Sequence, residues 1–337
     1  MLTLKASGVS FTSLILLAAI ALGSALGHFA PDTGERLGDW VDPTLLSLVA
    51  LLFFGVRFGA LLQAASNLRF FAVALLANFV LIPLIGYAVA WLLLGHHPLF
   101  MVGLVIYFMS PCTDWFLDFT RLAKGNVALG TALIPLNMLV QLLLYPLYLQ
   151  LFAGQAVAVE AGALGSTLLQ WFLQPLLLAI AAHQVLRWLL GGERFEALLA
   201  RVDQLLPWLI GLLVLEIFVG NIAVILEHRG VFAWVLLAVF IFFVLTFLLG
   251  EALSRLLHFD YPEHALLSMT TAARNAPLML AVTMAALPGQ PLIYAALVIG
   301  MLVEFPHLTA LSRVLLGTRR ERTWLSHLFQ ATRSRHQ

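Results

Sequence analysis

The residues best suited to chemistry in this 337-residue chain gather in three short polar stretches within strongly apolar surroundings. The first stretch is Ser110-Pro111-Cys112-Thr113-Asp114. Pro111 has no backbone N–H to donate, so this stretch predicts a helix break, at which Ser110 and Thr113 can satisfy freed backbone groups. The thiol of Cys112 would be a soft ligand for thiophilic solutes, or else this cysteine is a small packing residue. Asp114 is expected to line a polar cavity or to be solvated at its mouth, because an unpaired carboxylate at membrane depth is unfavourable.

The second stretch is Thr270-Thr271-Ala272-Ala273-Arg274-Asn275-Ala276-Pro277. Pro277, with Ala276 before it, predicts another helix break. Arg274 is the most informative residue, because a guanidinium stays protonated in proteins and is costly to bury in an apolar helix. It must meet a carboxylate, freed backbone carbonyls or a bound anion, unless it snorkels to the surface. Asp114 is its natural partner if the two breaks meet, and Asn275 would then frame the same cavity.

The third stretch is Gly300-Met301-Leu302-Val303-Glu304-Phe305-Pro306. Burial in an apolar span favours the neutral form of a carboxyl, so Glu304 is a candidate proton carrier, and Asp114 is a second one. The alternative is that Glu304 is a hydrogen-bonded packing residue. Glu216 and Asn221 stand alone in another apolar segment, and we expect them to be structural or surface residues.

The composition indicates a membrane protein without the motifs of an enzyme. Hydrophobic residues make up 62% of the chain, charged residues only 10%, and the mean hydropathy is +0.98, whereas soluble domains carry about 25% charged residues. A net charge of +1 gives no reason to expect a nucleic-acid partner. No metal-ligand spacing, phosphate-binding loop or nucleophile motif is present, so we expect no enzyme, metal or cofactor. The expected partners are membrane lipid, protons and a small-molecule or anionic solute.

A membrane span needs about 20 apolar residues, and the sequence contains ten such segments, which predicts an all-α polytopic membrane protein. They are Phe11–His28, Pro43–Ala64, Phe70–Leu94, Leu99–Ala123, Val127–Phe152, Ser166–Leu190, Gln204–Leu226, Val231–Leu257, His264–Leu287 and Pro291–Leu316. If both termini are cytoplasmic, Arg36 and Arg229 are the only lysine or arginine residues in the predicted outer loops, and nearly all the others lie on the cytoplasmic side. This is a strong positive-inside asymmetry. The prediction is a multi-pass protein of the cell inner (plasma) membrane with both termini cytoplasmic.

Five helices per half would insert the two halves with opposite orientation, and paired landmarks support such a repeat. Pro111 and Pro277 lie 166 residues apart, and Gly125 and Gly289 lie 164 residues apart. Inverted repeats with one discontinuous helix each indicate a secondary transporter. The predicted units are residues 1–160 with helices one to five, residues 161–318 with helices six to ten, and a basic cytoplasmic tail at 319–337.

On these residues the chain resembles the bile acid:sodium symporter superfamily and, within it, the arsenite efflux permease branch. Ser110-Pro111-Cys112-Thr113 is similar to the Pro-Cys-Thr motif of that branch, and Leu302-Val303-Glu304-Phe305-Pro306 is similar to its Val-Glu-Val-Pro motif. Lys124-Gly125-Asn126 resembles the Lys-Gly-Asp that follows the broken helix across the superfamily. The resemblance covers essentially all ten predicted helices.

The resemblance implies a fold and a mechanism. Helices three to five and eight to ten would form a core domain in which helices four and nine cross at their breaks. Helices one, two, six and seven would form a panel domain, and transport would be alternating access between the two. In arsenite permeases the cysteine matching Cys112 and the glutamate matching Glu304 are needed for export, which resembles exchange of trivalent arsenite for protons.

The chain also departs from these relatives. At the ninth-helix break, sodium-coupled members of the superfamily have a sequence similar to Glu-Thr-Gly-x-Gln-Asn. This chain has Thr270 in place of the glutamate and Arg274 in place of the glutamine. Their Asn-x-x-Asn in the fourth helix is Asp114-Trp115-Phe116-Leu117 here. A site that loses an anionic ligand and gains a fixed cation disfavours sodium and leaves protons as the coupling ion. The arginine also departs from the arsenite permeases.

The leading hypothesis is therefore a proton-coupled efflux permease for arsenite or a similar small solute. The solute would be framed by Cys112, Thr113, Asp114, Arg274 and Asn275, and protons would be carried by Glu304 and Asp114. The alternative is a transporter of organic anions, sodium-independent or sodium-coupled, in which Arg274 pairs with a carboxylate or sulfonate of the substrate. A transport-inactive receptor that keeps the fold is a third hypothesis.

Overall fold

The protein is built from α-helices, as the sequence predicts. The computed structural model describes residues 11–32, 37, 40–56, 67–113, 115–153 and 173–333, and within these ranges every regular element is a helix. The first half contains α1 (Phe11–Phe29), α3 (Val41–Phe54), α4 (Leu68–Leu76), the π-helical η2 (Ala77–Leu81), α5 (Ile82–Leu94), α6 (Pro98–Phe108), α7 (Phe116–Leu122), α8 (Val127–Tyr148) and the π-helical η3 (Leu149–Ala153). The second half contains α10 (Gln174–Leu190), α11 (Gly192–Glu227), the 3₁₀ turn η5 (Arg229–Val231), α12 (Phe232–Leu256), α13 (Tyr261–Ala272), α14 (Ala276–Ala286) and α15 (Pro291–Arg333).

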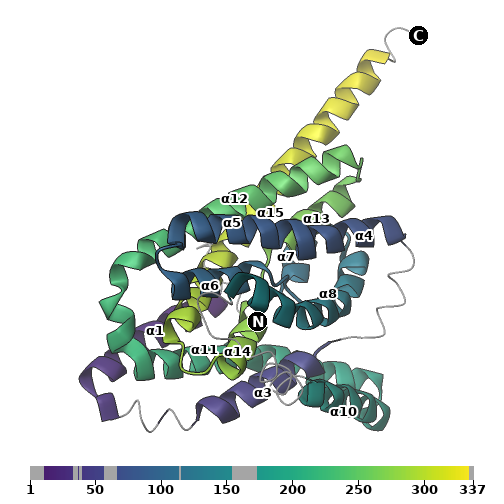
Figure 1. Cartoon of the computed structure of the whole chain (residues 1–337). Helices are drawn as coiled ribbons and strands as arrows, with labels where there is room; N and C mark the ends of the chain where they lie inside the picture. Colours follow the sequence, from purple (N-terminus) through teal and green to yellow (C-terminus); the bar gives the residue numbers. More distant parts are fainter. Residues whose placement is uncertain are drawn as a thin grey trace.

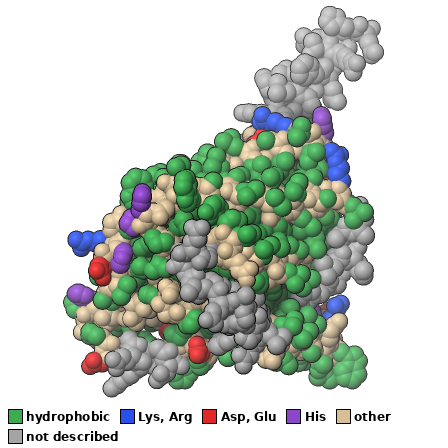
Figure 2. Space-filling model, viewed as in Figure 1, with side chains coloured by type: hydrophobic (Ala, Val, Ile, Leu, Met, Phe, Trp, Pro, Cys, Tyr) green, Lys and Arg blue, Asp and Glu red, His purple; other side chains and the backbone are tan. Residues whose placement is uncertain are grey.

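The apolar surface and the helix lengths are those of a multi-pass membrane protein. Among the described residues, five helical stretches are long and apolar enough to cross a membrane: Leu68–Leu94, Val127–Phe152, Gly192–Glu227, Arg229–Leu256 and Pro291–Thr318. Large apolar side chains such as Leu92 and Leu143 are exposed, and hydrophobic side chains cover most of the face shown in Figure 2. Because backbone groups cannot bond to lipid, closed helices are the structures that suit such a surface. The count of ten spans and the inverted repeat stay predictions.

The helices separate into two groups by their contacts. In one group α1, α3, α10 and α11 pack against one another, and they occupy the lower part of Figure 1. In the other group α5, α6 and α15 pack around α12, while α13 contacts α7, α8 and α12. The groups touch where α14 meets α3 and where α15 meets α1 and α11. This arrangement is compatible with the predicted panel and core, whose boundaries stay predictions.

Glycines allow the closest helix contact in the first group. Gly23 and Gly27 lie one turn apart on α1 and face α11. A Cβ at Gly23 would lie 2.7 Å from the carbonyl oxygen of Leu215, so only glycine permits this approach. Small residues four positions apart are a common device for packing membrane helices, since lipid gives them no hydrophobic drive to associate.

Two helices extend beyond the predicted apolar segments. The helix α11 begins at Gly192 rather than near Gln204, and α15 continues through the predicted tail to Arg333 and projects from the body in Figure 1. The length of an apolar segment predicts only the part of a helix that lipid surrounds, whereas residues that form helices well can extend the helix beyond it into water.

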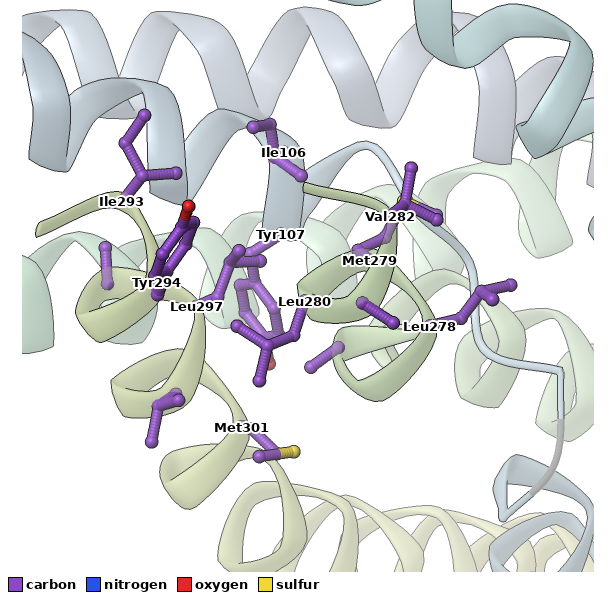
Figure 3. Packing of buried hydrophobic residues seen from close by; sticks show 14 of the residues in the cluster. Ile106, Tyr107, Leu278, Met279, Leu280, Val282, Ile293, Tyr294, Leu297 and Met301 are labelled. Carbon is purple, nitrogen blue, oxygen red and sulfur yellow. The ribbon is translucent and has the colours of Figure 1, made fainter. Parts of the chain in front are cut away.

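Apolar side chains of α6, α14 and α15 fill the space beside the helix breaks. Figure 3 shows Tyr107 of α6 beside Leu280 of α14 and Leu297 of α15, with Tyr294 and Met301 on neighbouring turns of α15. These residues are all at most 5% exposed. The breaks described below are therefore held in a packed interior rather than in a loose loop.

Candidate functional site

The two broken helices cross at their breaks and pair through their backbones. Between α6 and α7 the chain is extended around Pro111, and between α13 and α14 it is extended around Arg274, where the two stretches form an isolated antiparallel bridge. The N–H of Cys112 donates to the carbonyl of Ala273 (3.0 Å), and the N–H of Asn275 donates to the carbonyl of Ser110 (2.9 Å). Each break thus supplies part of the hydrogen bonding that the other has lost.

Proline and serine explain where these helices stop and restart. Pro111 cannot donate to the carbonyl of Tyr107, so α6 ends at Phe108. The hydroxyl of Ser110 bonds to the carbonyl of Ile106 in the last turn of the same helix (2.9 Å). Pro277 lies in the first turn of α14, where a missing N–H leaves no bond unmade. Ala276 and Pro277 therefore begin α14, and the extended stretch precedes them.

Arg274 is completely buried, and backbone carbonyls accept from both terminal nitrogens of its guanidinium, while its Nε has no hydrogen-bond partner among the described residues. Nη1 donates to the carbonyl of Phe108 (2.8 Å), and Nη2 donates to the carbonyls of Thr270 (2.9 Å) and Thr271 (2.8 Å). These acceptors lie at the C-terminal ends of α6 and α13, where helix carbonyls lack partners and carry partial negative charge. Of the partners expected from the sequence, freed carbonyls are the ones found. Asp114 lies outside the described residues.

An aromatic pair encloses the guanidinium on another side. The rings of Phe108 and Phe242 stack with centroids 3.9 Å apart and planes 15° apart. The guanidinium carbon of Arg274 lies 5.8 Å from the ring centroid of Phe242, within the range of a cation–π attraction. The cation therefore sits between the two half-helix ends with an aromatic face beside it.

Glu304 is completely buried on α15 and accepts hydrogen bonds from three directions. Its Oε1 accepts from the backbone N–H of Arg274 (2.9 Å) and from Nε1 of Trp115 (2.8 Å), just beyond the first break. The hydroxyl of Tyr107 lies 3.1 Å from Oε2 and 3.0 Å from the carbonyl of Gly300. Gly300 permits this, because a Cβ there would come within 2.8 Å of the tyrosine ring. Glu304 is thus bonded directly to residues at both breaks.

Thr113 and Asn275 join the two breaks on the side of a cavity. Nδ2 of Asn275 donates to Oγ1 of Thr113 (2.9 Å), and Thr113 also lines a cavity of about 300 Å³. The cavity lies between the two helix groups, and its remaining lining residues are Leu52, Gly55, Val56, Leu117, Asp118, Arg121, Val127, Thr131, Ile134, Asp203 and Leu206. The exposed ion pair of Arg121 with Asp118 (3.0 Å) is part of this lining, on the side predicted to face the cytoplasm.

Cys112 has a different environment from Thr113. Its side chain is fully buried in an apolar cluster with Phe116, Ala272 and Leu308, and it does not line the cavity. In this conformation the thiol therefore lies within packed apolar side chains rather than at the cavity wall.

Other polar residues at the site were missed or only partly used by the sequence analysis. Tyr107 and Trp115 hold Glu304, yet in the sequence they look like any other aromatic residues of an apolar span. Asn78 of η2 donates to Oγ1 of Thr270 (3.0 Å), and Asn137 of α8 approaches the same oxygen (3.4 Å). Asparagines inside apolar segments were the signal that could have found this cluster.

A helical membrane protein in which two proline-broken helices cross, with a polar cavity beside the crossing, has the architecture of a secondary transporter. A sequence profile of the Sodium Bile acid symporter family matches residues 43–228. That range is more than half of the chain, and the chain belongs to this family, whose members are transporters rather than enzymes.

Individual relatives are distant. The probable sodium/metabolite cotransporter BASS2, chloroplastic, of Oryza sativa subsp. japonica is 25% identical over 77% of this chain and 60% of its own length. The arsenical-resistance protein Acr3 of Corynebacterium glutamicum is 23% identical over 91% of this chain and 88% of its own length. The uncharacterized sodium-dependent transporter YocS of Bacillus subtilis is 24% identical over 71% of this chain and 73% of its own length.

Proposed function

We propose that this protein is a secondary active transporter that exports arsenite or a similar small solute in exchange for protons, without using sodium. The observation that carries the proposal is the guanidinium of Arg274 on the carbonyls that end α6 and α13. In transporters with broken helices, unwound carbonyls and half-helix C-terminal ends are the groups that coordinate sodium. Here a tethered cation already occupies such acceptors.

A fixed cation changes what can drive transport. A sodium ion placed beside Arg274 would meet a like charge in a low-dielectric interior, where repulsion is strong. Thr270, whose hydroxyl is neutral, supplies no carboxylate to offset that repulsion. The driving ion must therefore act elsewhere, and a proton on a buried carboxyl is the option that the site offers.

Glu304 suits that task because its protonation would alter the crossing directly. As a carboxylate it accepts from Arg274, Trp115 and Tyr107. A proton placed on either oxygen reduces this accepting capacity, so one of these bonds must weaken or turn. Protonation and the geometry of both breaks are then coupled through a single side chain.

The cavity supports a small solute. Thr113 lies at its wall and carries the hydrogen bond from Asn275, so a ligand there would compete for groups of both breaks. Cys112 is the adjacent residue, and a thiophilic solute would reach its thiol only after the breaks move. The match to Acr3 of Corynebacterium glutamicum, described as an arsenical-resistance protein, covers 91% of this chain and 88% of Acr3, and it supports arsenite as the first solute to test.

Transport of an organic anion is the alternative, and the cavity lining favours it in one respect. Arg121 contributes a cation to the cavity, although it is paired with Asp118. Arg274 is a weaker anchor for an anion than the sequence suggested, because two of its nitrogens are engaged by carbonyls and the side chain is fully buried.

The deciding experiment is a proteoliposome assay in which sodium and proton gradients are imposed separately. Arsenite, antimonite and simple organic anions are offered to the purified protein. We expect arsenite or antimonite flux to follow the proton gradient and to ignore sodium. Flux of an organic anion that needs sodium would overturn the proposal.

Three variants test the roles of the breaks in the same assay. Cys112→Ser should abolish arsenite flux and arsenite tolerance in a sensitised host, whereas under the anion hypothesis Cys112→Ser should do little and Arg274→Gln should abolish anion transport. The double variant Thr270→Glu with Arg274→Gln removes the tethered cation and supplies a carboxylate, as in the sodium-coupled pattern. We expect it to gain sodium dependence, and continued proton dependence without sodium would contradict the role given to Arg274.

A further inference from the structure

Gln141 of α8 is a buried amide that the transport site does not use. It is 2% exposed, and neither its nitrogen nor its oxygen has a hydrogen-bond partner among the described residues. Leaving a buried amide unpaired costs about 1–3 kcal/mol for each unsatisfied group. Proteins therefore keep such groups chiefly where ordered water or a ligand completes their bonding.

The neighbours of Gln141 along α8 show which way it faces. Asn137 and Tyr145 lie one turn before and one turn after it, on the same side of the helix. Asn137 approaches Oγ1 of Thr270 on α13 (3.4 Å), and the hydroxyl of Tyr145 lies 3.1 Å from Oγ1 of Thr283 on α14. Gln141 therefore faces the gap between α13 and α14, behind the helix break that carries Arg274.

Further unsatisfied oxygens lie at the same place. Asn78 and Asn137 both direct their Nδ2 atoms to Thr270, and their Oδ1 atoms are buried without a partner among the described residues. Asn78 belongs to the π-helical turn η2, and the hydroxyl of Tyr148 donates to the carbonyl of Phe79 in the same turn. A π-turn inside an α-helix is often found at a functional site.

We propose that Gln141, Asn78 and Asn137 bind a small cluster of internal water, which carries protons between the outer half of the protein and the crossing. An internal water needs two to four polar partners. The unpaired Oδ1 atoms of Asn78 and Asn137 beside Thr270, and the two unpaired amide atoms of Gln141 one turn along α8 from Asn137, supply them. Water and hydroxyl groups can each accept one proton and release another at the same oxygen, so a chain of them can pass a proton without a charged relay, while the amides hold the water in place. This inference rests on the proposed proton coupling.

Among the described residues, few charged or titratable groups lie around this water site. Tyr145 and Tyr148 face it from α8, Tyr294 approaches from α15, and Arg274 stands at the break. Arg274 links the site to Glu304, because its Nη2 bonds to the carbonyl of Thr270 and its backbone N–H bonds to the carboxyl. The cavity beside Thr113 is lined by other residues, so solute and protons would use separate routes.

The first test needs no transport. Gln141→Met keeps the side-chain volume and removes the amide, and the thermal unfolding midpoint of the purified chain is measured in detergent. If the amide binds water, the midpoint falls, because that water loses a partner and Asn137 is left unpaired. If the amide is dry, the midpoint rises, because an uncompensated polar group is removed, and the proposal is overturned. Asn221→Leu is the matched control, since its amide is satisfied within α11 by Ile217 (2.9 Å).

The second test uses proteoliposomes and arsenite. Gln141→Met should lose the stimulation of arsenite flux by a proton gradient and keep exchange in the absence of a gradient, while Asn221→Leu keeps both. Full stimulation in Gln141→Met overturns the proton role. If the wild type itself shows no stimulation, the proposed coupling fails, and the unfolding midpoint still decides whether the amide is hydrated.

Discussion

The two helix breaks look alike in the sequence and differ in the structure. Both contain a proline with polar neighbours, and both leave carbonyls of the preceding half-helix without partners. At the first break the hydroxyl of Ser110 bonds to the carbonyl of Ile106, and the N–H of Asn275 in the second break bonds to the carbonyl of Ser110. At the second break Arg274 satisfies its own half-helix and that of the first break together. The second break therefore organises the crossing, and the first is fitted to it.

The two breaks also differ in the roles that their residues can have, one in contact with the solute and the other in holding the crossing together. The residues that reach the cavity or carry the thiol belong to the first break, namely Thr113 and Cys112. The charge that fixes the geometry belongs to the second. Glu304 accepts hydrogen bonds from Arg274 at the second break and from Trp115 just beyond the first. Among the described residues it is therefore the carboxyl whose protonation would change the hydrogen bonding of both breaks.

Removing the cation should have the largest effect. Arg274→Met leaves three buried carbonyls without a donor, at about 1–3 kcal/mol for each unsatisfied group, and we expect a marked loss of thermal stability in detergent. Arg274→Lys keeps the charge and loses the planar fork, so its loss should be smaller. A methionine variant as stable as the wild type would show that the second break does not organise the crossing.

The next effect is on coupling rather than on stability. Glu304→Gln keeps an acceptor for the N–H of Arg274, so we expect destabilisation of only about 1 kcal/mol, with proton-driven flux lost. Glu216→Gln is the control, because Glu216 is buried on α11 and is held by Thr44 alone among the described residues (3.0 Å). Proton-driven flux in Glu304→Gln, measured in proteoliposomes, would remove Glu304 from the mechanism.

The smallest effect should come from the side-chain link between the breaks. A double-mutant cycle with Thr113→Ala and Asn275→Ala should give a coupling energy of about 0.6 kcal/mol, since such bonds in membrane proteins are modest. Ser110→Ala is the comparison, because its hydroxyl bonds within its own helix and should not couple to the Asn275 side chain. Equal coupling in both cycles would mean that the link is not specific.

The all-helical membrane class could be predicted from the sequence because lipid imposes a length and a polarity that composition reveals. The breaks were predictable for a similar reason, since a proline beside polar residues has few other uses in an apolar span. The predicted bounds erred where no lipid constraint applies, as at the start of α11 and the end of α15.

The site was predictable in its members more than in its contacts. The sequence required a partner for Arg274 and left three kinds open. Only the crossing of the two breaks, which brings the carbonyls that end α6 and α13 to the same guanidinium, decides for carbonyls. Tyr107 and Trp115 could not be assigned, because nothing local distinguishes an aromatic residue that holds a carboxyl from one that faces lipid. The π-turn that positions Asn78 likewise depends on contacts with α8 and α13 rather than on local sequence.

The hydrogen bond from Arg274 to Phe108 spans 166 residues of sequence, and this has a consequence for synthesis. At about 5–20 residues per second the first broken helix is made on the order of 10 s before the arginine that completes it. During that interval the end of α6 is in or near the membrane with its carbonyls still unpaired. The nascent first half must therefore be held by the insertion machinery, by water or by neighbouring helices until the second half arrives.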